Sequence, residues 1–433
     1  MKKITVHPVS SLQGTLLVPG DKSISHRSVM LGSLAYGTTR VENFLNSADC
    51  VSTMNIFRMM GVRIQQKGNT LTIHGKGLNS LKPPKKTLNA GNSGTTARII
   101  LGILAGQPFT SRLTGDKYLR RRPMKRVVEP LLQMHARISG EGDGNWLPLK
   151  VETRKLLGAT YRLPVASAQV KSSILMAGLF AKGQTRVVEP TPSRDHTERM
   201  FSAFGIPFEE TKNSITVYGP VKPFKGRKIL VPSDISSAAF FIVAGLITPN
   251  SRLLLKNIGV NPTRTGLLDV LKKMGGRITV YPKKTVKGGE PVADILVESS
   301  RLKALVLDDE KLIPRMVDEF PILAVAASQA HGKTVVKNAS ELKVKESDRI
   351  LMMAITLKKM GADIQPTTDG WIINGPTALT GCALSSAGDH RIAMSLAVAA
   401  LIAKGATTIL DTENINTSFP GFEALLKKVS KHR

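Results

Sequence analysis

The chain has 433 residues, 42% of them hydrophobic and 21% charged, which suits two or three globular domains and excludes a largely disordered protein. No apolar run approaches the ~20 residues that a membrane-spanning helix needs, and two cysteines without a CxxC pair argue against a disulfide framework or a Cys-based zinc site. The net charge of +29 favours either nucleic acid or a small anionic metabolite as partner, although an aromatic content of 5% offers few side chains for base stacking.

Six apolar, helix-like stretches recur along the chain at spacings of 67 to 84 residues. They begin at His26, Thr96, Gln169, Ser236, Phe320 and His390. Each stretch is apolar on nearly all sides, which is typical of a helix that is buried on most faces. The recurrence predicts a repeated structural unit.

The segments that follow these helices repeat as well. A small turn leads into a β-branched strand, as in GTTRVENF and GKTVVKNAS, and an amphipathic helix and an alternating strand pair come next. The unit is therefore helix, strand, helix and hairpin, about 72 residues long. The sixth unit ends without a hairpin, and we expect the N-terminal segment ITVHPVSSLQGTLLVPG to supply the missing strands.

Six such units predict an α/β fold with two globular domains of three repeats each. We expect residues 21–232 to form one domain. Residues 1–20 together with 233–433 form the other, because the N-terminal strands complete the last repeat. The beginning of the chain lacks the apolar segment of a secretory signal, so we expect a cytoplasmic protein.

Polar and cationic residues gather at the predicted helix N-termini, in Gly20–Arg27, Asn92–Arg98, Ser167–Ser172, Lys345–Arg349 and Gly388–Arg391. Ser, Thr, Asn and Asp at such positions also serve as ordinary N-caps. A Lys or Arg there opposes the helix dipole, however, and a cap does not need one. An anion-binding site does, because helix N-termini bind phosphate and carboxylate.

Other chemistries lack their motifs. The GNSGTT turn has no GK[ST] ending of a nucleotide-binding P-loop, and neither HExxH nor GxSxG occurs. The candidate acid and base groups are Asp318 and Glu319 in IPRMVDEFP, and Glu346 between Lys345 and Arg349. An acid among bases is most often a solvated ion pair, but these carboxylates stand beside the starts of repeat helices.

The motifs resemble those of one family, the 5-enolpyruvylshikimate-3-phosphate synthases. The resemblance spans the chain and is carried, in the family's order, by GDKSISHR, NAGNSGTTAR, LRRRPM, SAQVKS, DEFP, KVKESDRI and DHRIAM. It implies the enolpyruvyl transferase fold, which is similar to an inverse α/β barrel and has two globules of three repeats each.

The resemblance also implies the reaction and the ligands. The enolpyruvyl group of phosphoenolpyruvate passes to the 5-hydroxyl of shikimate 3-phosphate with release of phosphate, on the route to chorismate and the aromatic amino acids. The residues that the family motifs assign to shikimate 3-phosphate are Lys22, Ser23, Arg27, Ser167, Gln169, Asp318 and Lys345. Those assigned to phosphoenolpyruvate are Lys22, Gly94, Arg122, Gln169, Arg349 and Arg391. No metal and no organic cofactor is implied.

Three residues have catalytic roles by the same resemblance. Asp318 and Glu346 match the groups that exchange protons with the 5-hydroxyl and the methylene carbon, and Lys22 assists them. The inhibitor glyphosate occupies the phosphoenolpyruvate site in sensitive members, and members with Ala at the position of Gly94 tolerate it. The chain keeps Gly94, so we expect glyphosate to inhibit it.

Two positions depart from the commonest pattern. Thr417 stands where some members have a Lys, and Ala168 stands where many have a second Ser. Both changes resemble the family's second, more divergent class. They leave open which residue takes the place of the Lys at Thr417.

Two alternatives remain at this point. A UDP-N-acetylglucosamine enolpyruvyl transferase would share the fold and the phosphoenolpyruvate chemistry, but it has a reactive Cys in a Gly-rich loop, which neither Cys50 nor Cys382 matches. An RNA-binding or RNA-end-processing protein would suit the charge, but its cations should form one stripe with aromatic residues between them. We expect a monomer that binds small anions, without a membrane or a specific nucleic acid as partner.

Overall fold

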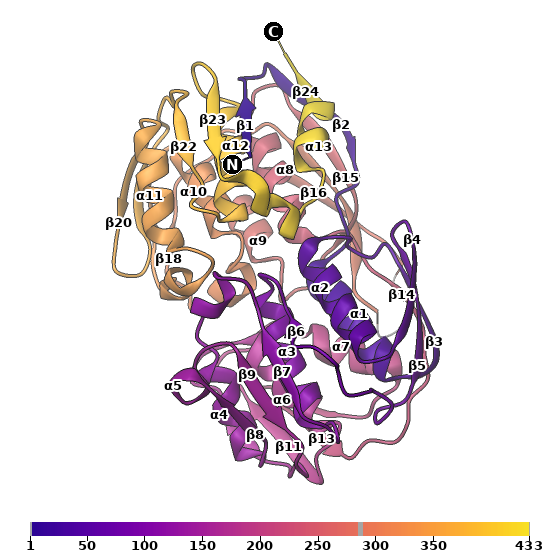
Figure 1. Cartoon of the computed structure of the whole chain (residues 1–433). Coiled ribbons are helices and arrows are strands. Elements are labelled where there is room, and N and C mark those ends of the chain that lie inside the picture. Colours follow the sequence, from indigo (N-terminus) through magenta and orange to yellow (C-terminus); the bar gives the residue numbers. More distant parts are fainter. Residues whose placement is uncertain (1, 285–288, 433) are drawn as a thin grey trace. The chain divides into compact units, whose positions relative to one another are not determined.

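The computed structural model describes residues 2–284 and 289–432 and divides into two compact units (Figure 1). The central unit comprises Gly20–Val231. The terminal unit comprises the residues up to Pro19 and nearly all of the described residues from Pro232 onward. Each unit has a hydrophobic core of its own.

Three repeats of helix, strand, helix and hairpin build the central unit. The first helices of the repeats are α1 (Lys22–Leu34), α3 (Gly94–Ala105) and α6 (Ala168–Gly178). The second helices are α2 (Ala48–Met59), α4 (Lys125–Gln133) and α7 (His196–Phe204). Two short helical segments are η1 (Leu119–Arg121) and α5 (Glu141–Gly144).

Each repeat of the central unit also forms a four-stranded sheet. The first sheet has the order β14 (Lys228–Leu230), β3 (Tyr36–Glu42), β5 (Thr70–Lys76) and β4 (Arg63–Lys67). The second is β6 (Leu88–Asn89), β7 (Ser111–Thr114), β9 (Leu149–Glu152) and β8 (Arg137–Gly140), and the third is β10 (Thr160–Arg162), β11 (Gly183–Val188), β13 (Ser214–Gly219) and β12 (Glu209–Thr211).

The edge strands connect these repeats in a ring. In every sheet the first strand named comes from the preceding repeat and pairs in parallel with its neighbour, whereas the other pairs are antiparallel. Strand β14 follows the third repeat and pairs with β3 of the first. The central unit is therefore closed by its own last strand.

The first helices of the central unit are almost fully buried, as their all-round apolar sequences predict. Small residues let them approach closely. A Cβ placed on Gly102 of α3 would lie 1.9 Å from the backbone oxygen of Ser173 in α6, so only glycine fits at this crossing. The Ala, Gly and Ser content of these helices thus follows from packing helix against helix in the middle of the unit.

The terminal unit repeats the plan with α8 (Ile235–Ile247), α10 (Phe320–Ser328) and α12 (His390–Ala400) as buried helices. Its second helices are α9 (Gly266–Lys273), α11 (Arg349–Lys359) and α13 (Phe422–Val429). Three short 3-10 segments are η2 (Ile313–Met316), η3 (Ser340–Val344) and η4 (Thr412–Thr417).

The sheets of the terminal unit use both ends of the chain. One has the order β16 (Arg277–Pro282), β17 (Val292–Glu298), β15 (Arg252–Gly259), β2 (Ser11–Leu16) and β24 (Ser430–Lys431). The second is β18 (Val306–Leu307), β19 (Gly332–Val336), β21 (Trp371–Gly375) and β20 (Asp363–Pro366), and the third is β1 (Lys3–Val6), β23 (Thr407–Leu410) and β22 (Ala383–Ser385).

The N-terminal segment has two separate functions in this unit. Strand β1 pairs antiparallel with β23 and takes the place of the hairpin that the sixth repeat lacks, as predicted (Figure 1). Strand β2, which was expected to complete the sixth repeat as well, instead pairs in parallel with β15 of the fourth repeat. It occupies the position that a strand from the preceding repeat fills in the other sheets.

Within the described residues, no helix combines the length and the apolar character needed to cross a membrane.

Candidate active site

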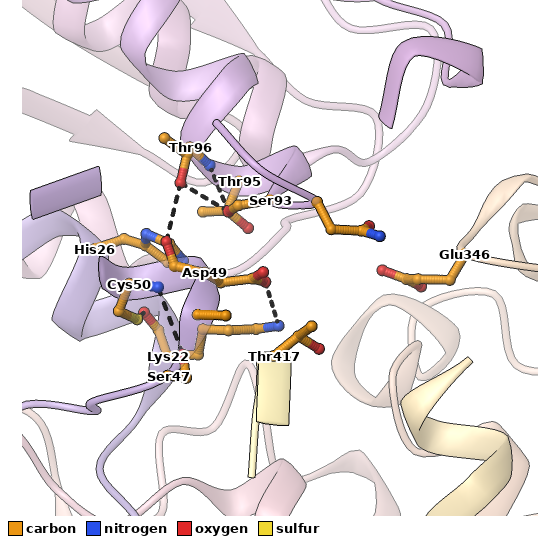
Figure 2. Close-up of polar contacts among 12 residues, drawn as sticks. Lys22, His26, Ser47, Asp49, Cys50, Ser93, Thr95, Thr96, Glu346 and Thr417 are labelled. Carbon is orange, nitrogen blue, oxygen red and sulfur yellow. Dashed lines mark hydrogen bonds and ion pairs between the residues drawn. The ribbon is translucent and has the colours of Figure 1, made fainter. Parts of the chain in front are cut away.

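The predicted site residues of the central unit start from the N-terminus of α1. Asp21 caps this helix by accepting a backbone N–H bond at 2.8 Å. The ammonium of Lys22 lies 3.0 Å from a carboxylate oxygen of Asp49 in the first turn of α2 (Figure 2). The hydroxyl of Thr96 in α3 donates to the backbone oxygen of Asp49 at 3.5 Å. The ion pair therefore lies where the N-terminal turns of three helices meet.

Arg27, one turn further along α1, is buried with 3% of its surface exposed. Its Nε donates to the hydroxyl of Thr197 in α7 at 2.8 Å, and its Nη2 donates to the hydroxyl of Ser172 in α6 at 2.6 Å. Its Nη1 donates to the backbone oxygen of Ser23 at 3.0 Å. Within the central unit, three neutral oxygens orient this guanidinium.

The start of α3 holds a second group of cations. Ser93 caps α3, and the predicted Gly94 is its first residue. A Cβ on Gly94 would lie 3.0 Å from Nη1 of Arg98 and 3.4 Å from Nη1 of Arg122. The missing side chain therefore leaves room for two guanidinium groups beside the helix N-terminus, where an anion is also favoured by the backbone.

Side chains of α6 connect to this group. The amide oxygen of Gln169 accepts from Nη1 of Arg98 at 2.8 Å, and its nitrogen donates to the hydroxyl of Thr95 at 3.1 Å. Arg122 donates to the amide oxygen of Asn92 at 2.7 Å. Ser167 occupies the N-cap position of α6 and makes no side-chain capping bond within the described structure, so its hydroxyl is not needed to begin the helix.

In the terminal unit the predicted residues gather around Arg349, the first residue of α11, which is 1% exposed. Its Nε lies 2.9 Å from Asp389, its Nη2 2.5 Å from Glu346, and its Nη1 3.6 Å from Asp318. Burial alone would lower the pKa of Arg349, but these three carboxylates raise it above the ordinary guanidinium value.

Asp318 lies between two arginines. Its Oδ2 is 3.4 Å from Nη2 of Arg391, in addition to its contact with Arg349, and its side chain is 21% exposed. The neighbouring Glu319 is 1% exposed and accepts a hydrogen bond from Ser236, which in turn accepts from Arg264 at 2.7 Å. Of the two adjacent acids, Asp318 is therefore the one that a solute can reach.

Lys345 and Thr417 complete the predicted positions of the terminal unit. The ammonium of Lys345 lies 3.1 Å from Glu341. Burial lowers the pKa of Lys345, although the charges of Glu341 and Asp318 oppose that shift. Thr417 ends η4, and its hydroxyl donates to the backbone oxygen of Asn414 at 2.6 Å. A neutral side chain bonded to its own turn thus stands at the position where a Lys was expected from some family members.

Comparison with known proteins decides the family. The family model of EPSP synthase (3-phosphoshikimate 1-carboxyvinyltransferase) matches residues 6–426. The chain is 54% identical over 429 residues to the 3-phosphoshikimate 1-carboxyvinyltransferase of Geotalea uraniireducens, covering 99% of both chains. It is 51% identical over 424 residues to that of Bacillus subtilis, covering 98% of both chains. A solved structure of EPSP synthase from Acinetobacter baumannii matches with a TM-score of 0.89 and 45% identity, covering 100% of this chain and 99% of that one.

The chain belongs to the EPSP synthase family. Its activity is accordingly that of a 3-phosphoshikimate 1-carboxyvinyltransferase in aromatic amino-acid biosynthesis. The predicted α/β fold and the predicted enzyme class are both confirmed. The assignment to the more divergent class and the roles of individual residues stay predictions.

The two cysteines of this EPSP synthase are free. Cys50 is buried in α2, and burial raises the pKa of its thiol far above the usual range. Burial also raises the pKa of the Cys382 thiol. A thiol with a raised pKa is a poor nucleophile at neutral pH. Neither residue therefore resembles the reactive Cys of the alternative enolpyruvyl transferase.

Several residues of the site were missed by sequence reasoning. Arg98, Ser172 and Asp389 lie in the polar clusters and motifs that the sequence points to, but no individual role is predicted for them, and Thr197 lies outside those clusters. Asp389 both caps α12, by accepting from the backbone of Arg391 at 2.9 Å, and binds Arg349. The sequence position of Asp389 indicates only the capping role. Its contact with Arg349 involves a residue 40 positions away in the sequence.

The described residues contain no group of three or more His, Cys, Asp or Glu side chains that could hold a metal ion.

Proposed function

We propose that this protein transfers the enolpyruvyl group of phosphoenolpyruvate to the 5-hydroxyl of shikimate 3-phosphate through residues of both units. The observation that carries the proposal is the match to EPSP synthase over residues 6–426, in which every predicted motif lies. The cation groups of the two units support it, because both substrates carry phosphate and carboxylate and would repel each other without them.

Shikimate 3-phosphate is bound chiefly by the central unit in this proposal. Lys22, Ser23 and Arg27 come from α1 or its start, and Ser167 and Gln169 come from the start of α6. Hydroxyl and carbonyl oxygens of the central unit orient the guanidinium of Arg27, and a guanidinium in a fixed orientation suits a directed bond to an anionic group of the substrate. Asp318 and Lys345 of the terminal unit complete the set.

Phosphoenolpyruvate is bound by arginines that present planar forks to its phosphate and carboxylate. Arg122 stands beside Gly94 and the N-terminus of α3, with Lys22 and Gln169 from the neighbouring helices. Arg349 is the first residue of α11, and Arg391 lies in the first turn of α12, both in the terminal unit. The open space at Gly94 lets the ligand approach the backbone N–H groups of α3.

Asp318 and Glu346 perform the proton transfers, and Lys22 assists. Addition needs a base for the 5-hydroxyl and an acid for the methylene carbon. Elimination then removes a proton from the resulting methyl carbon as the bond to phosphate breaks and phosphate leaves. Both carboxylates contact Arg349, at 3.6 Å for Asp318 and 2.5 Å for Glu346. This shared cation holds the two carboxylates in place.

Thr417 and Ala168 support the further proposal that the protein belongs to the more divergent class of EPSP synthases. A monomeric state and a cytoplasmic location also stay predictions from the sequence, as does the independence from metals and cofactors.

A phosphate-release assay with two acceptors tests the proposed function. We expect turnover when phosphoenolpyruvate is combined with shikimate 3-phosphate, and none when UDP-N-acetylglucosamine replaces the shikimate. Addition of a chelator should leave the rate unchanged. Phosphate release from phosphoenolpyruvate with UDP-N-acetylglucosamine, and none with shikimate 3-phosphate, would overturn the assignment.

A further inference from the structure

Three ionisable side chains form a buried cluster behind Arg27, and none of them belongs to the proposed substrate contacts. The ammonium of Lys171 lies 2.6 Å from Oε1 of Glu198 and 2.8 Å from Oε2 of Glu189. The exposed fractions of the Lys171, Glu189 and Glu198 side chains are 2%, 6% and 4%. Lys171 lies in the first turn of α6, Glu198 lies in the first turn of α7, and Glu189 directly follows β11.

Such a cluster is a costly way to stabilise a fold. Desolvating charges costs several kcal/mol per ion, and hydrophobic replacements of the same volume are often as stable. Here two carboxylates share one ammonium. Burial raises the pKa of Glu198 in spite of Lys171, and Oε2 of Glu198 is buried without a hydrogen-bond partner among the described residues. An arrangement with this cost suggests a role in geometry.

The geometry leads directly to Arg27. Lys171 and Ser172 are consecutive in α6, and Thr197 and Glu198 are consecutive in α7. Two side-chain contacts connect these helices. The first is the ion pair of Lys171 with Glu198. The second is the hydrogen bond between the hydroxyls of Ser172 and Thr197, at 2.6 Å. Arg27 donates to both of these hydroxyls, at 2.6 and 2.8 Å.

Glu189 extends the cluster to the segment that leads into α7. Its Oε1 accepts a hydrogen bond from the backbone N–H of Ser193 at 3.2 Å and another from the Ser193 hydroxyl at 2.5 Å. Its other oxygen binds Lys171. The carboxylate therefore connects the segment that leads into α7 with the start of α6.

We infer that Lys171, Glu189 and Glu198 are positioning residues for shikimate 3-phosphate, because they fix the separation of α6 and α7 at which Ser172 and Thr197 orient the Arg27 guanidinium. The inference rests on the proposed role of Arg27. A guanidinium displaced by about 1 Å loses much of a directed phosphate interaction. The cluster thus acts on binding of the phosphorylated shikimate and leaves the proton-transfer groups unchanged.

Two conservative variants test the inference. Glu189→Gln and Glu198→Gln each keep the side-chain shape and leave Lys171 with one carboxylate. We expect the KM for shikimate 3-phosphate to rise by about tenfold, as for contacting residues of one network, while kcat falls by less than about threefold. Glu129→Gln is the matched control, because Glu129 pairs with Lys125 at 3.7 Å in the same unit with both side chains about half exposed.

A double-mutant cycle with Arg27→Gln separates positioning from general stabilisation. In the Arg27→Gln background, Glu189→Gln should change shikimate 3-phosphate affinity by less than about twofold. An equal loss of shikimate 3-phosphate affinity from Glu189→Gln in the wild-type and Arg27→Gln backgrounds would overturn the inference. So would a lowered melting temperature with an unchanged KM. Glu189→Gln retains the 2.6 Å ion pair of Lys171 with Glu198 between α6 and α7. It is therefore the variant to measure if Glu198→Gln does not fold.

The wild-type enzyme distinguishes this inference from the proposed function. If wild-type protein neither binds nor turns over shikimate 3-phosphate, the proposed function fails. If it does both and the Gln variants match it, only the positioning role fails.

Discussion

The predicted site arginines of the two units contact different kinds of oxygen atom within their own unit. In the central unit, Arg27 and Arg122 donate to hydroxyl, carbonyl and amide oxygens. In the terminal unit, Arg349 and Arg391 lie against carboxylates. Neutral acceptors orient a guanidinium and leave its charge for a ligand, whereas carboxylates offset that charge.

From this difference we predict that the two units divide substrate binding and proton transfer between them. We expect the central unit to hold the stronger attraction for phosphate groups, because its sequence contains no Asp or Glu between Asp49 and Asp116. The terminal unit combines cations with Asp318 and Glu346, the acids that we propose to move protons. Substitutions in the central unit should therefore affect mainly binding, and substitutions of acids in the terminal unit should affect mainly turnover.

The largest effect is expected from Asp318→Asn. Removing a proton-transfer group should lower kcat by about 10²- to 10⁴-fold, while the dissociation constant for shikimate 3-phosphate changes by less than about threefold. Steady-state kinetics and calorimetry measure the two quantities. Asp309→Asn, at a nearby exposed acid whose carboxylate accepts from the backbone of Lys311, is the control. Near-normal turnover by Asp318→Asn would assign the base to another residue.

Arg27→Gln should have the opposite pattern. Loss of a charged hydrogen-bond donor costs about 1.5–3 kcal/mol, so the KM for shikimate 3-phosphate should rise by about 10- to 100-fold with a much smaller change in kcat. Arg40→Gln on the exposed side of β3, where Arg40 is 59% exposed and pairs with Glu42, should leave both constants unchanged. A fall in kcat alone would contradict the division between the units.

Gly94→Ala should act on the inhibitor more than on the substrate. The added methyl group would lie 3.0 Å from Arg98 and 3.4 Å from Arg122, so at least one guanidinium has to shift. Glyphosate is longer than phosphoenolpyruvate and loses more from the reduced space. We expect wild-type inhibition competitive with phosphoenolpyruvate. In the variant, the inhibition constant should rise by a larger factor than the KM for phosphoenolpyruvate. Wild-type activity indifferent to millimolar glyphosate would contradict the account of Gly94.

Acid should weaken an ion-pair cluster of the terminal unit at Asp294. Burial alone would raise the pKa of Asp294, but Lys256 and Lys283 lower it to about 2. A depressed carboxylate pKa stabilises the fold above the unfolded value near 4, and this contribution is lost as the pH falls through 2. The wild type should therefore have a higher melting temperature than Asp294→Asn at pH 6. The difference between the two melting temperatures should shrink between pH 4 and 2. A gap independent of pH would refute the assignment.

Thr417→Lys should have the smallest effect. It adds one partly solvated charge, worth at most about 1 kcal/mol, and removes the hydroxyl bond to Asn414. We expect the KM for phosphoenolpyruvate and the inhibition constant of glyphosate to fall by about twofold to fivefold. No change in either constant would mean that Thr417 does not contribute to the phosphoenolpyruvate site.

The sequence predicts the repeated fold well because the pattern is local. Apolar helices, turns and hairpins recur within each unit of about 72 residues, and the six buried helices form where the pattern places them. The position of β2 was not predictable in the same way. A strand that joins a sheet about 240 residues away in the sequence has no local signal for its partner.

For the candidate site, too, the sequence predicts local features but not the contacts between distant segments. The motif residues at helix starts can be named, but the residue pattern without the family resemblance does not choose between Asp318 and Glu319, whose exposure and partners differ in the structure. Arg98, Asp389, Ser172 and Thr197 owe their roles to side chains from other repeats. A motif shows which residues come together in sequence, whereas these contacts depend on how the repeats pack.

The most direct test of the account is a calorimetric titration in two steps. Shikimate 3-phosphate is added to the wild-type enzyme, and glyphosate is then added to the binary complex. We expect heat in both steps, and in the first step a dissociation constant that Arg27→Gln weakens by about 10- to 100-fold. No heat from shikimate 3-phosphate, or equal affinity of the wild type and Arg27→Gln, would contradict the claim that the cations of the central unit bind the phosphorylated substrate.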